Sequence, residues 1–149
     1  MQFNLFLNAR IPDSVPEEMR QWIVKLKKIK SKEACIRKAY DLITKKFRGE
    51  RIHMKYNEIF ISDPKKIWKR KVIFCTTFNW LMKILLIKSK KFMPEDIKIK
   101  WSFVWYLSLH QHLQVRVSRN KAVNVDLWGH YHNIKFGDYA RGFHKTTPQ

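Results

Sequence analysis

Residues 109–128 read LHQHLQVRVSRNKAVNVDLW, and this stretch decides the fold. Apolar and polar residues alternate on both sides of residues 118–120, which is typical of two antiparallel strands joined by a tight turn. We expect a three-residue connection in which Asn120 takes the left-handed conformation that such loops need. The stretch therefore predicts a β-hairpin made of residues 110–117 and 121–128.

Counting outward from this turn gives the register of the hairpin. The predicted pairs on the apolar face are Val117–Lys121, Val115–Val123 and Leu113–Val125. His112 and Asp126 would then lie opposite each other on the other face, within side-chain reach. Matching His110 with Asp126 would require a longer loop. We therefore expect His112 to be the partner of Asp126.

The chain before the hairpin is mostly helical in pattern. Capping-box spacing of Ser14 and Glu17 predicts a first helix within residues 13–29, and a second should run from Ser31 to a stop at Gly49. Further segments follow as an irregular strand or loop (51–61), a short capped helix (62–70), an apolar helix (72–91) and a strand (97–109). Helices followed by strands indicate a single α+β domain over residues 1–149, with N-terminal helices packed on a C-terminal antiparallel sheet.

Cys75 stands at the predicted beginning of the apolar helix, whereas Cys35 falls on the apolar side of the second helix. A helix N-terminus favours a thiolate through the helix dipole and its free N–H groups. A carboxylate can fix the tautomer of an imidazole, which can in turn deprotonate a thiol. We therefore expect a catalytic set of Cys75, His112 and Asp126, with Cys35 in the core.

These segments resemble the transglutaminase-like superfamily of papain-like cysteine enzymes. Residues 74–86 (FCTTFNWLMKILL) are similar to its cysteine helix, 112–117 (HLQVRV) to its histidine strand and 123–128 (VNVDLW) to its aspartate strand. Upstream, 37–50 and 67–75 resemble the helix and the approach that precede the nucleophile. The resemblance implies a papain-like core with the nucleophile at the start of a central helix, packed on an antiparallel sheet.

It also implies acyl transfer on a peptide or carboxamide bond through a thioester, without a cofactor. Water as acceptor makes the protein a peptidase or amidase, and a lysine amine makes it a protein-glutamine transglutaminase. The chain is small and has no calcium-ligand pattern, so we expect hydrolysis of a protein or peptide substrate. Trp68 and Trp128 are candidates for the walls of the cleft, and His110 for a further substrate contact.

The amino-acid composition limits the alternative functions and locations of the protein. The 149 residues carry a net charge of +19 with 31 Lys and Arg, most of them lysines scattered through the helical half. Such a charge suits nucleic acid, and a non-catalytic basic module is the alternative function, although no DNA- or RNA-recognition motif accompanies it. No apolar run has membrane-spanning length and no leader pattern opens the chain, so a cytoplasmic protein is expected.

The remaining histidines have a second interpretation. His110, His112, His130 and His132 alternate in HQH and HYH, a spacing that can bind zinc on neighbouring strands. The cysteine that would have to join them begins a distant helix, so we predict no metal. Residues 137–144 are expected to close the domain by packing Tyr139 and Phe143 on it.

Overall fold

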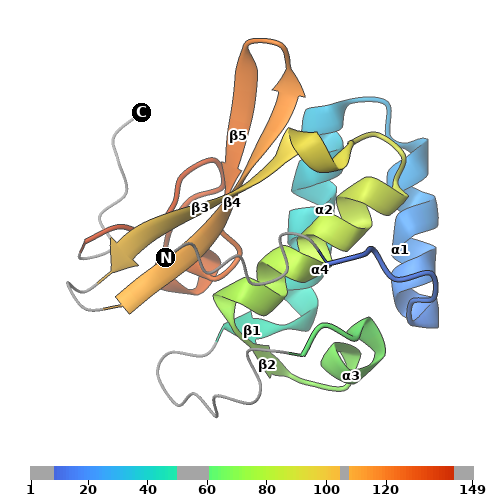
Figure 1. Cartoon of the computed structure of the whole chain (residues 1–149), viewed down its shortest axis with the longest axis horizontal. Coiled ribbons are helices and arrows are strands. Elements are labelled where there is room, and N and C mark those ends of the chain that lie inside the picture. The colour runs from blue at the N-terminus through green and yellow to red at the C-terminus, as the bar shows by residue number, and fades with distance from the viewer. Residues whose placement is uncertain (1–8, 50–60, 105–107, 143–149) are drawn as a thin grey trace.

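The computed structural model describes residues 9–49, 61–104 and 108–142. They form a mixed α+β fold with helices on one side and a three-stranded antiparallel sheet on the other (Figure 1). The elements are α1 (Glu17–Lys28), α2 (Lys32–Lys46), β1 (Arg48–Gly49), α3 (Pro64–Trp68), β2 (Val72–Ile73), α4 (Cys75–Lys88), the 3-10 helix η2 (Pro94–Asp96), β3 (Ile97–Val104), β4 (Ser108–Ser118), β5 (Lys121–Val125) and the 3-10 helix η3 (Gly129–His132). The expected segment at 51–61 lies, except for Ile61, outside the described residues, as does Phe143.

The first two helices differ from the sequence prediction at their ends. α1 begins at Glu17 after Pro16 and has no side-chain cap, so the predicted capping box is wrong. A proline disfavours helical geometry in the residue before it, which keeps Val15 out of the helix. α2 starts close to the predicted position, with Ser31 as its N-cap, but it ends at Lys46 rather than at Gly49.

Gly49 instead belongs to β1, which pairs in parallel with β2. A Cβ atom at this position would lie 3.0 Å from Cδ1 of Trp128 and 3.1 Å from a ring carbon of Tyr131. The glycine is therefore needed for close packing below Trp128, and not for ending a helix.

α4 is the centre of the helical layer. It packs against α1, α2 and β4, and most of its side chains are buried. Burying one large aliphatic side chain contributes about 1.5–3 kcal/mol, so a helix that is apolar nearly all round belongs in the interior. Cys75 is its first residue, as the sequence predicts.

The sheet has the strand order β3-β4-β5. The predicted pairs Leu113–Val125 and Val115–Val123 are confirmed, but Lys121 pairs with Ser118 rather than with Val117 because an irregularity lies between Arg116 and Ser118. The connection is therefore a two-residue turn. Positive φ values among the described non-glycine residues occur at Lys90 and Asn133, so the left-handed Asn120 is also wrong.

β5 is much shorter than β4, and this length difference creates the site described below. β5 ends at Val125, opposite Leu113, whereas β4 extends back to Ser108 and stays paired there with β3. The edge of β4 that β5 leaves open is contacted by α4, because Asn79 donates a hydrogen bond to the carbonyl oxygen of Gln111. The chain after β5 folds back against the same end of the sheet (Figure 1).

Residues 137–142, the crossing segment, run from one edge of the sheet to the other. Gly137 forms a bridge with Asn124 of β5 and Gly142 forms one with Val104 of β3. Both glycines have positive φ values, 96° and 56°, which an L-residue with a side chain rarely adopts. Between these points Ser102 donates a hydrogen bond of 2.7 Å to the carbonyl oxygen of Ala140. Within the described part of the chain, no helix is long and apolar enough to cross a membrane.

Candidate active site

The Cys75 thiol stands at the N-terminus of the buried helix α4 and is itself half-buried. Phe74 precedes it in extended conformation, so the helix begins abruptly from β2. The first N–H groups of an α-helix have no acceptor within the helix and point out of its N-terminus. The thiol therefore lies where negative charge on sulfur, or on an oxygen next to it, is favoured.

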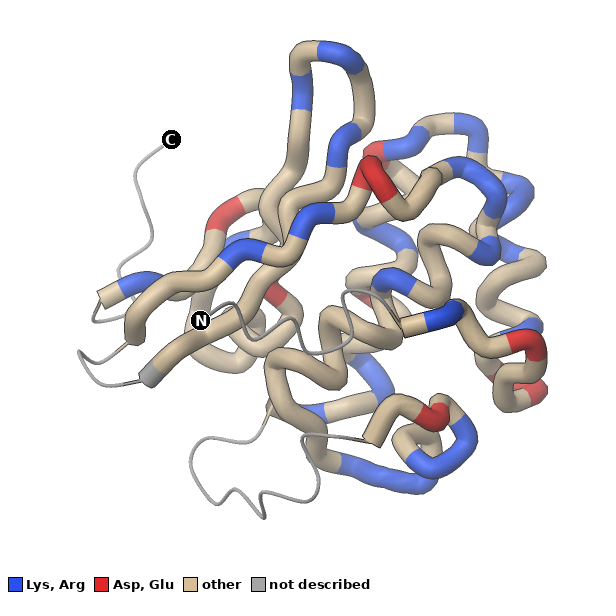
Figure 2. Tube along the Cα trace, viewed as in Figure 1, with Lys and Arg blue, Asp and Glu red and all other residues tan. Residues whose placement is uncertain are grey.

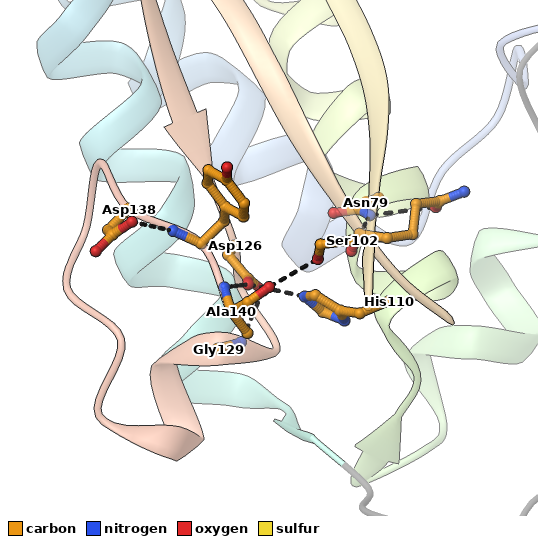
Figure 3. A network of polar contacts seen from close by, with 9 residues as sticks. Asn79, Ser102, His110, Asp126, Gly129, Asp138 and Ala140 are labelled. Carbon is orange, nitrogen blue, oxygen red and sulfur yellow. Dashed lines mark hydrogen bonds and ion pairs between the residues drawn. The ribbon is translucent and has the colours of Figure 1, made fainter. Parts of the chain in front are cut away.

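His110 of β4 forms the central contact of the site. Its Nε2 atom lies 2.8 Å from Oδ2 of Asp126, and both side chains are almost completely buried (Figure 3). The Cys75 thiol also interacts with the His110 side chain and acts, with Asp126, to raise its pKa. The structure thus brings Cys75, His110 and Asp126 together in one connected cluster.

The surroundings of His110 favour its charged form. Burial is the largest influence and acts against the charge, but hydrogen bonds and charge interactions with Asp126 and Cys75 outweigh it and raise the pKa of His110 to about 10. At neutral pH the ring is therefore an imidazolium that can donate one N–H to each partner.

Asp126 is the anchor of the cluster. Its Oδ1 accepts a hydrogen bond of 2.7 Å from the N–H of Gly129, and its Oδ2 accepts one of 2.8 Å from the N–H of Ala140 (Figure 3). Burial acts to raise the pKa of Asp126, but His110 and the two backbone donors outweigh it, so that the pKa is lowered. A buried carboxylate held by three donors keeps its charge and its orientation.

The predicted pairing of His112 with Asp126 is wrong. His112 lies opposite Lys100 in the β3–β4 ladder, and its ring stacks on Tyr139 with centroids 4.2 Å apart and planes 7° apart. Its Nδ1 atom is buried and has no hydrogen-bond partner among the described residues. Burial, with the charges of His110 and Lys100, lowers the pKa of His112 to about 4 against a smaller opposing effect of Asp126.

The physical reason for the error is that the strand ends one residue before Asp126. By continued counting Asp126 would have faced His112, but its carboxylate instead bonds the N–H of Gly129 and the chain turns into η3. An Asp followed three residues later by Gly is a turn signature, and in residues 126–129 (DLWG) it could have predicted this exit. His110 and His112 share a face of β4, so alternation could not distinguish them.

Gly129 is required at this turn. A Cβ atom there would lie 2.8 Å from both Cγ and Oδ2 of Asp126 and 3.0 Å from Cβ of Ile134. Any side chain would displace the carboxylate from His110. Sequence reasoning did not single out this glycine.

Asn79 links α4, which begins at Cys75, to β4, which carries His110. Its Nδ2 atom donates to the carbonyl oxygen of Gln111 at 2.9 Å and to the Gln111 side-chain oxygen at 3.2 Å, and both residues are buried. Asn79 lies one turn after Cys75, and Gln111 follows His110 directly. These two bonds therefore fix where the thiol stands relative to the imidazole.

The two tryptophans predicted to wall the cleft lie in different places. Trp128 packs on His110, with ring centroids 4.8 Å apart. Trp68 packs instead on Trp22 and Phe47, and its indole N–H donates to Glu18. Its described contacts thus join α3 to α1, and the prediction that it lines the cleft is not supported.

Within residues 9–49, 61–104 and 108–142, no group of three or more His, Cys, Asp or Glu side chains is arranged to hold a metal ion. When an imidazolium lies between a thiol and a carboxylate, the thiol can attack a carbonyl carbon as its thiolate. The ring can then give and take the protons of the reaction. Comparison of the chain with protein-family models, curated proteins and solved structures gave no significant match.

Proposed function

We propose that the protein is a cysteine-dependent acyl-transfer enzyme with Cys75 as nucleophile, His110 as general acid and base, and Asp126 as the residue that orients His110. The observation that carries this proposal is the buried contact between His110 and Asp126, with the thiol of Cys75 on the same ring. A buried imidazolium between a carboxylate and a thiol at a helix N-terminus has the composition of an activated nucleophile.

The reaction that this arrangement supports has two steps. The Cys75 thiolate attacks the carbonyl carbon, a carbon–sulfur bond forms, and the carbon–nitrogen bond breaks as His110 gives its proton to the leaving amine. Water, or an amine, then attacks the thioester while His110 takes its proton, and the carbon–sulfur bond breaks to restore the thiolate. First-turn N–H groups of α4 are suited to stabilise the oxyanion in both steps.

The fold assigned with this proposal is a transglutaminase-like, papain-like core. Its support is the order of parts: a cysteine opening a central helix, then the histidine on one strand, then the aspartate directly after the next strand. The shift of the base from His112 to His110 leaves this order unchanged.

An activated ester tests the chemistry without knowledge of the natural substrate. We expect p-nitrophenyl acetate to release a burst of one nitrophenolate per chain and to leave one acetyl group on Cys75, located by peptide mapping. Cys75→Ala should lose the burst and keep the slow acetylation of surface lysines. A burst that persists in Cys75→Ala, or acetylation confined to lysines in the wild type, would reject the proposal.

Hydrolysis is the proposed overall reaction, with transamidation by a lysine amine as the competing one. A glutamine-containing peptide offered with and without a primary amine separates the two. Ammonia release that does not depend on the amine supports hydrolysis, whereas predominant incorporation of the amine assigns a transglutaminase.

A second function, polyanion binding, is favoured by one feature of the surface. Lysines gather where α1 and α4 end, and Nζ of Lys91 reaches the carbonyl oxygen of Lys27 at 3.1 Å (Figure 2). Part of this charge offsets the negative ends of the two helix dipoles. Salt-dependent binding of nucleic acid that persists in Cys75→Ala would support this function, and absence of binding at low salt would remove it.

A further inference from the structure

A pocket of about 350 Å³ lies on the polar face of the sheet, below the crossing segment. Two cross-strand pairs form its floor: Lys100 with His112, and Gln114 with Asn124. Tyr139 of the crossing segment and Trp101 of β3 complete the lining. The pocket thus has contributions from all three strands, and the crossing segment is anchored at both sheet edges.

The chemistry of the pocket favours an anion. The residues that line it include no carboxylate, and each of them carries an N–H or O–H group that can donate a hydrogen bond. Lys100 supplies the one positive charge. One ammonium group with neutral donors suits a single negative charge, whereas a phosphate dianion is usually bound by several cations or by Arg.

His112 supplies the second, independent observation. Its side chain is 3% exposed, lines the pocket and has an Nδ1 atom without a partner among the described residues. Buried polar atoms are almost always hydrogen-bonded, so an orphaned ring nitrogen beside a cavity points to a missing ligand. Stacking on Tyr139 holds the ring in place for such a ligand.

The pocket adjoins the cluster of Cys75, His110 and Asp126 in two ways. The rings of His112 and His110 are stacked with centroids 6.5 Å apart. Tyr139 directly precedes Ala140, whose N–H donates to Asp126. A group bound in the pocket would therefore lie one side chain away from the base.

We propose that this pocket binds a carboxylate group, and that it belongs to the peptide substrate as its C-terminal carboxylate. The first part is independent of catalysis, and the second rests on the proposed acyl transfer. Lys100 pairs with the carboxylate, and Asn124, Gln114 and the ring of His112 donate hydrogen bonds to it. Trp101 contacts the apolar side chain beside it.

Binding to Cys75→Ala protein tests the site without turnover. The probes are N-acetyl-Ala-Ala-Phe with a free carboxylate, the same peptide as its amide, and sodium acetate. NMR titration follows the side-chain amides of Asn124 and Gln114 and the ring of His112. We expect the amide peptide to bind roughly tenfold more weakly than the acid, as loss of a charge-assisted hydrogen bond implies.

Lys100→Gln should weaken binding of the acid by a similar factor and leave the amide peptide unchanged. Lys25→Gln is the control, because Lys25 is an exposed lysine of α1 that does not line the pocket, and it should alter binding less than twofold. Equal binding of acid and amide, or equal effects of the two lysine variants, would overturn the pocket assignment.

Acetate tests whether the pocket recognises the carboxylate of a peptide or any small carboxylate. If the peptide acid binds at least tenfold more tightly than acetate, the peptide assignment is supported, and if acetate binds as tightly, it is wrong. A carboxylate preference in a protein that forms no acyl-Cys75 would leave the pocket standing while rejecting the proposed function.

Discussion

The two cysteines lie in neighbouring helices and in opposite environments. Cys35 is completely buried in α2, its Sγ atom 4.0 Å from the carbonyl oxygen of Leu26. Burial raises the pKa of Cys35, and weaker effects of Ser89 and Lys91 do not reverse this. Cys75 is half-buried at the first position of α4 and interacts with His110, whose pKa it acts to raise.

The difference teaches that position, and not residue type, decides what a thiol does here. Within a helix the backbone N–H groups are already bonded, and an apolar core gives a thiolate nothing to interact with. At the N-terminus the N–H groups are free, and the end of a neighbouring strand can bring an imidazolium beside the sulfur. Each test below removes one part of this difference.

The largest expected effect is on alkylation of the two thiols. Iodoacetamide at pH 6 should modify Cys75 alone in the folded protein, with Cys35 reacting at least about a hundredfold more slowly because it needs a local opening. Cys75→Ala should then give no adduct, whereas Cys35→Ala should label like the wild type. Peptide mapping by mass spectrometry measures both sites, and faster labelling of Cys35 would contradict the comparison.

Removing the imidazolium should make Cys75 behave like an ordinary thiol. His110→Gln is expected to slow alkylation of Cys75 at pH 6 by roughly a hundredfold, because it removes the imidazolium that favours the thiolate. His112→Gln removes the histidine that does not contact Asp126, and it should change the alkylation rate of Cys75 less than about threefold. A larger effect of His112→Gln would return the catalytic assignment to that residue.

His110→Gln leaves Asp126 buried without its cation, which costs about 3–5 kcal/mol. The double variant His110→Gln/Asp126→Asn removes the uncompensated charge, but its amide NH2 faces one of the two backbone donors of Gly129 and Ala140, so circular dichroism is used to verify that it is folded. If its Cys75 still labels at the wild-type rate at pH 6, His110 does not activate the thiol.

The sequence predicts those parts of the site that depend on local pattern. Cys75 follows from the apolar helix that it opens, and the pairs Leu113–Val125 and Val115–Val123 follow from alternation around the turn. These features need no knowledge of distant segments. The α+β class rests on the same local patterns.

Which histidine contacts Asp126 depends on interactions that the local sequence pattern does not contain. Asp126 turns toward His110 because the N–H groups of Gly129 and Ala140 hold its carboxylate, and Ala140 lies fourteen residues further along the chain. The crossing segment brings Ala140 there through bridges at both edges of the sheet. An irregularity near Val117 likewise comes from the turn geometry, which residue alternation does not encode.

His110 and His112 should contribute to the free energy of unfolding with opposite dependence on pH. The pKa of His112 is lowered to about 4 in the folded chain from an ordinary value of 6.5, so the unfolded chain takes up a proton first. The stabilising contribution of neutral His112 is present above pH 6.5 and is lost as the pH falls through about 4.

His112→Phe keeps a ring against Tyr139 and should abolish this contribution to acid sensitivity, which amounts to about 2–3 kcal/mol. Urea unfolding between pH 7 and pH 4 measures it. His110 has the opposite sign: its pKa is raised to about 10, so its stabilisation is present below pH 6.5 and is lost as the pH rises through about 10. If His112→Phe loses as much stability between pH 7 and pH 4 as the wild type, His112 is not buried as a neutral ring in the folded protein.

The smallest expected effect concerns the distance between thiol and imidazole. Asn79→Leu keeps the branching at Cγ but removes both bonds to Gln111, so that the first turn of α4 can shift along β4. We expect alkylation of Cys75 at pH 6 to slow by about tenfold, with a stability loss of about 1–3 kcal/mol from the unpaired carbonyl oxygen of Gln111. The stability loss alone would follow from any broken buried bond.

Thr44→Val is the control that separates a loss of stability from a change in the position of the Cys75 thiol. It removes a side-chain hydrogen bond of 2.8 Å to the Tyr40 carbonyl within α2, and should lower stability without moving the pH profile of Cys75 alkylation. Asn79→Leu should shift that profile toward alkaline pH, because a thiolate further from the imidazolium loses its cationic partner. If both variants give the wild-type profile, Asn79 stabilises the fold without positioning the nucleophile, and α4 is held in register by its apolar contacts with the sheet.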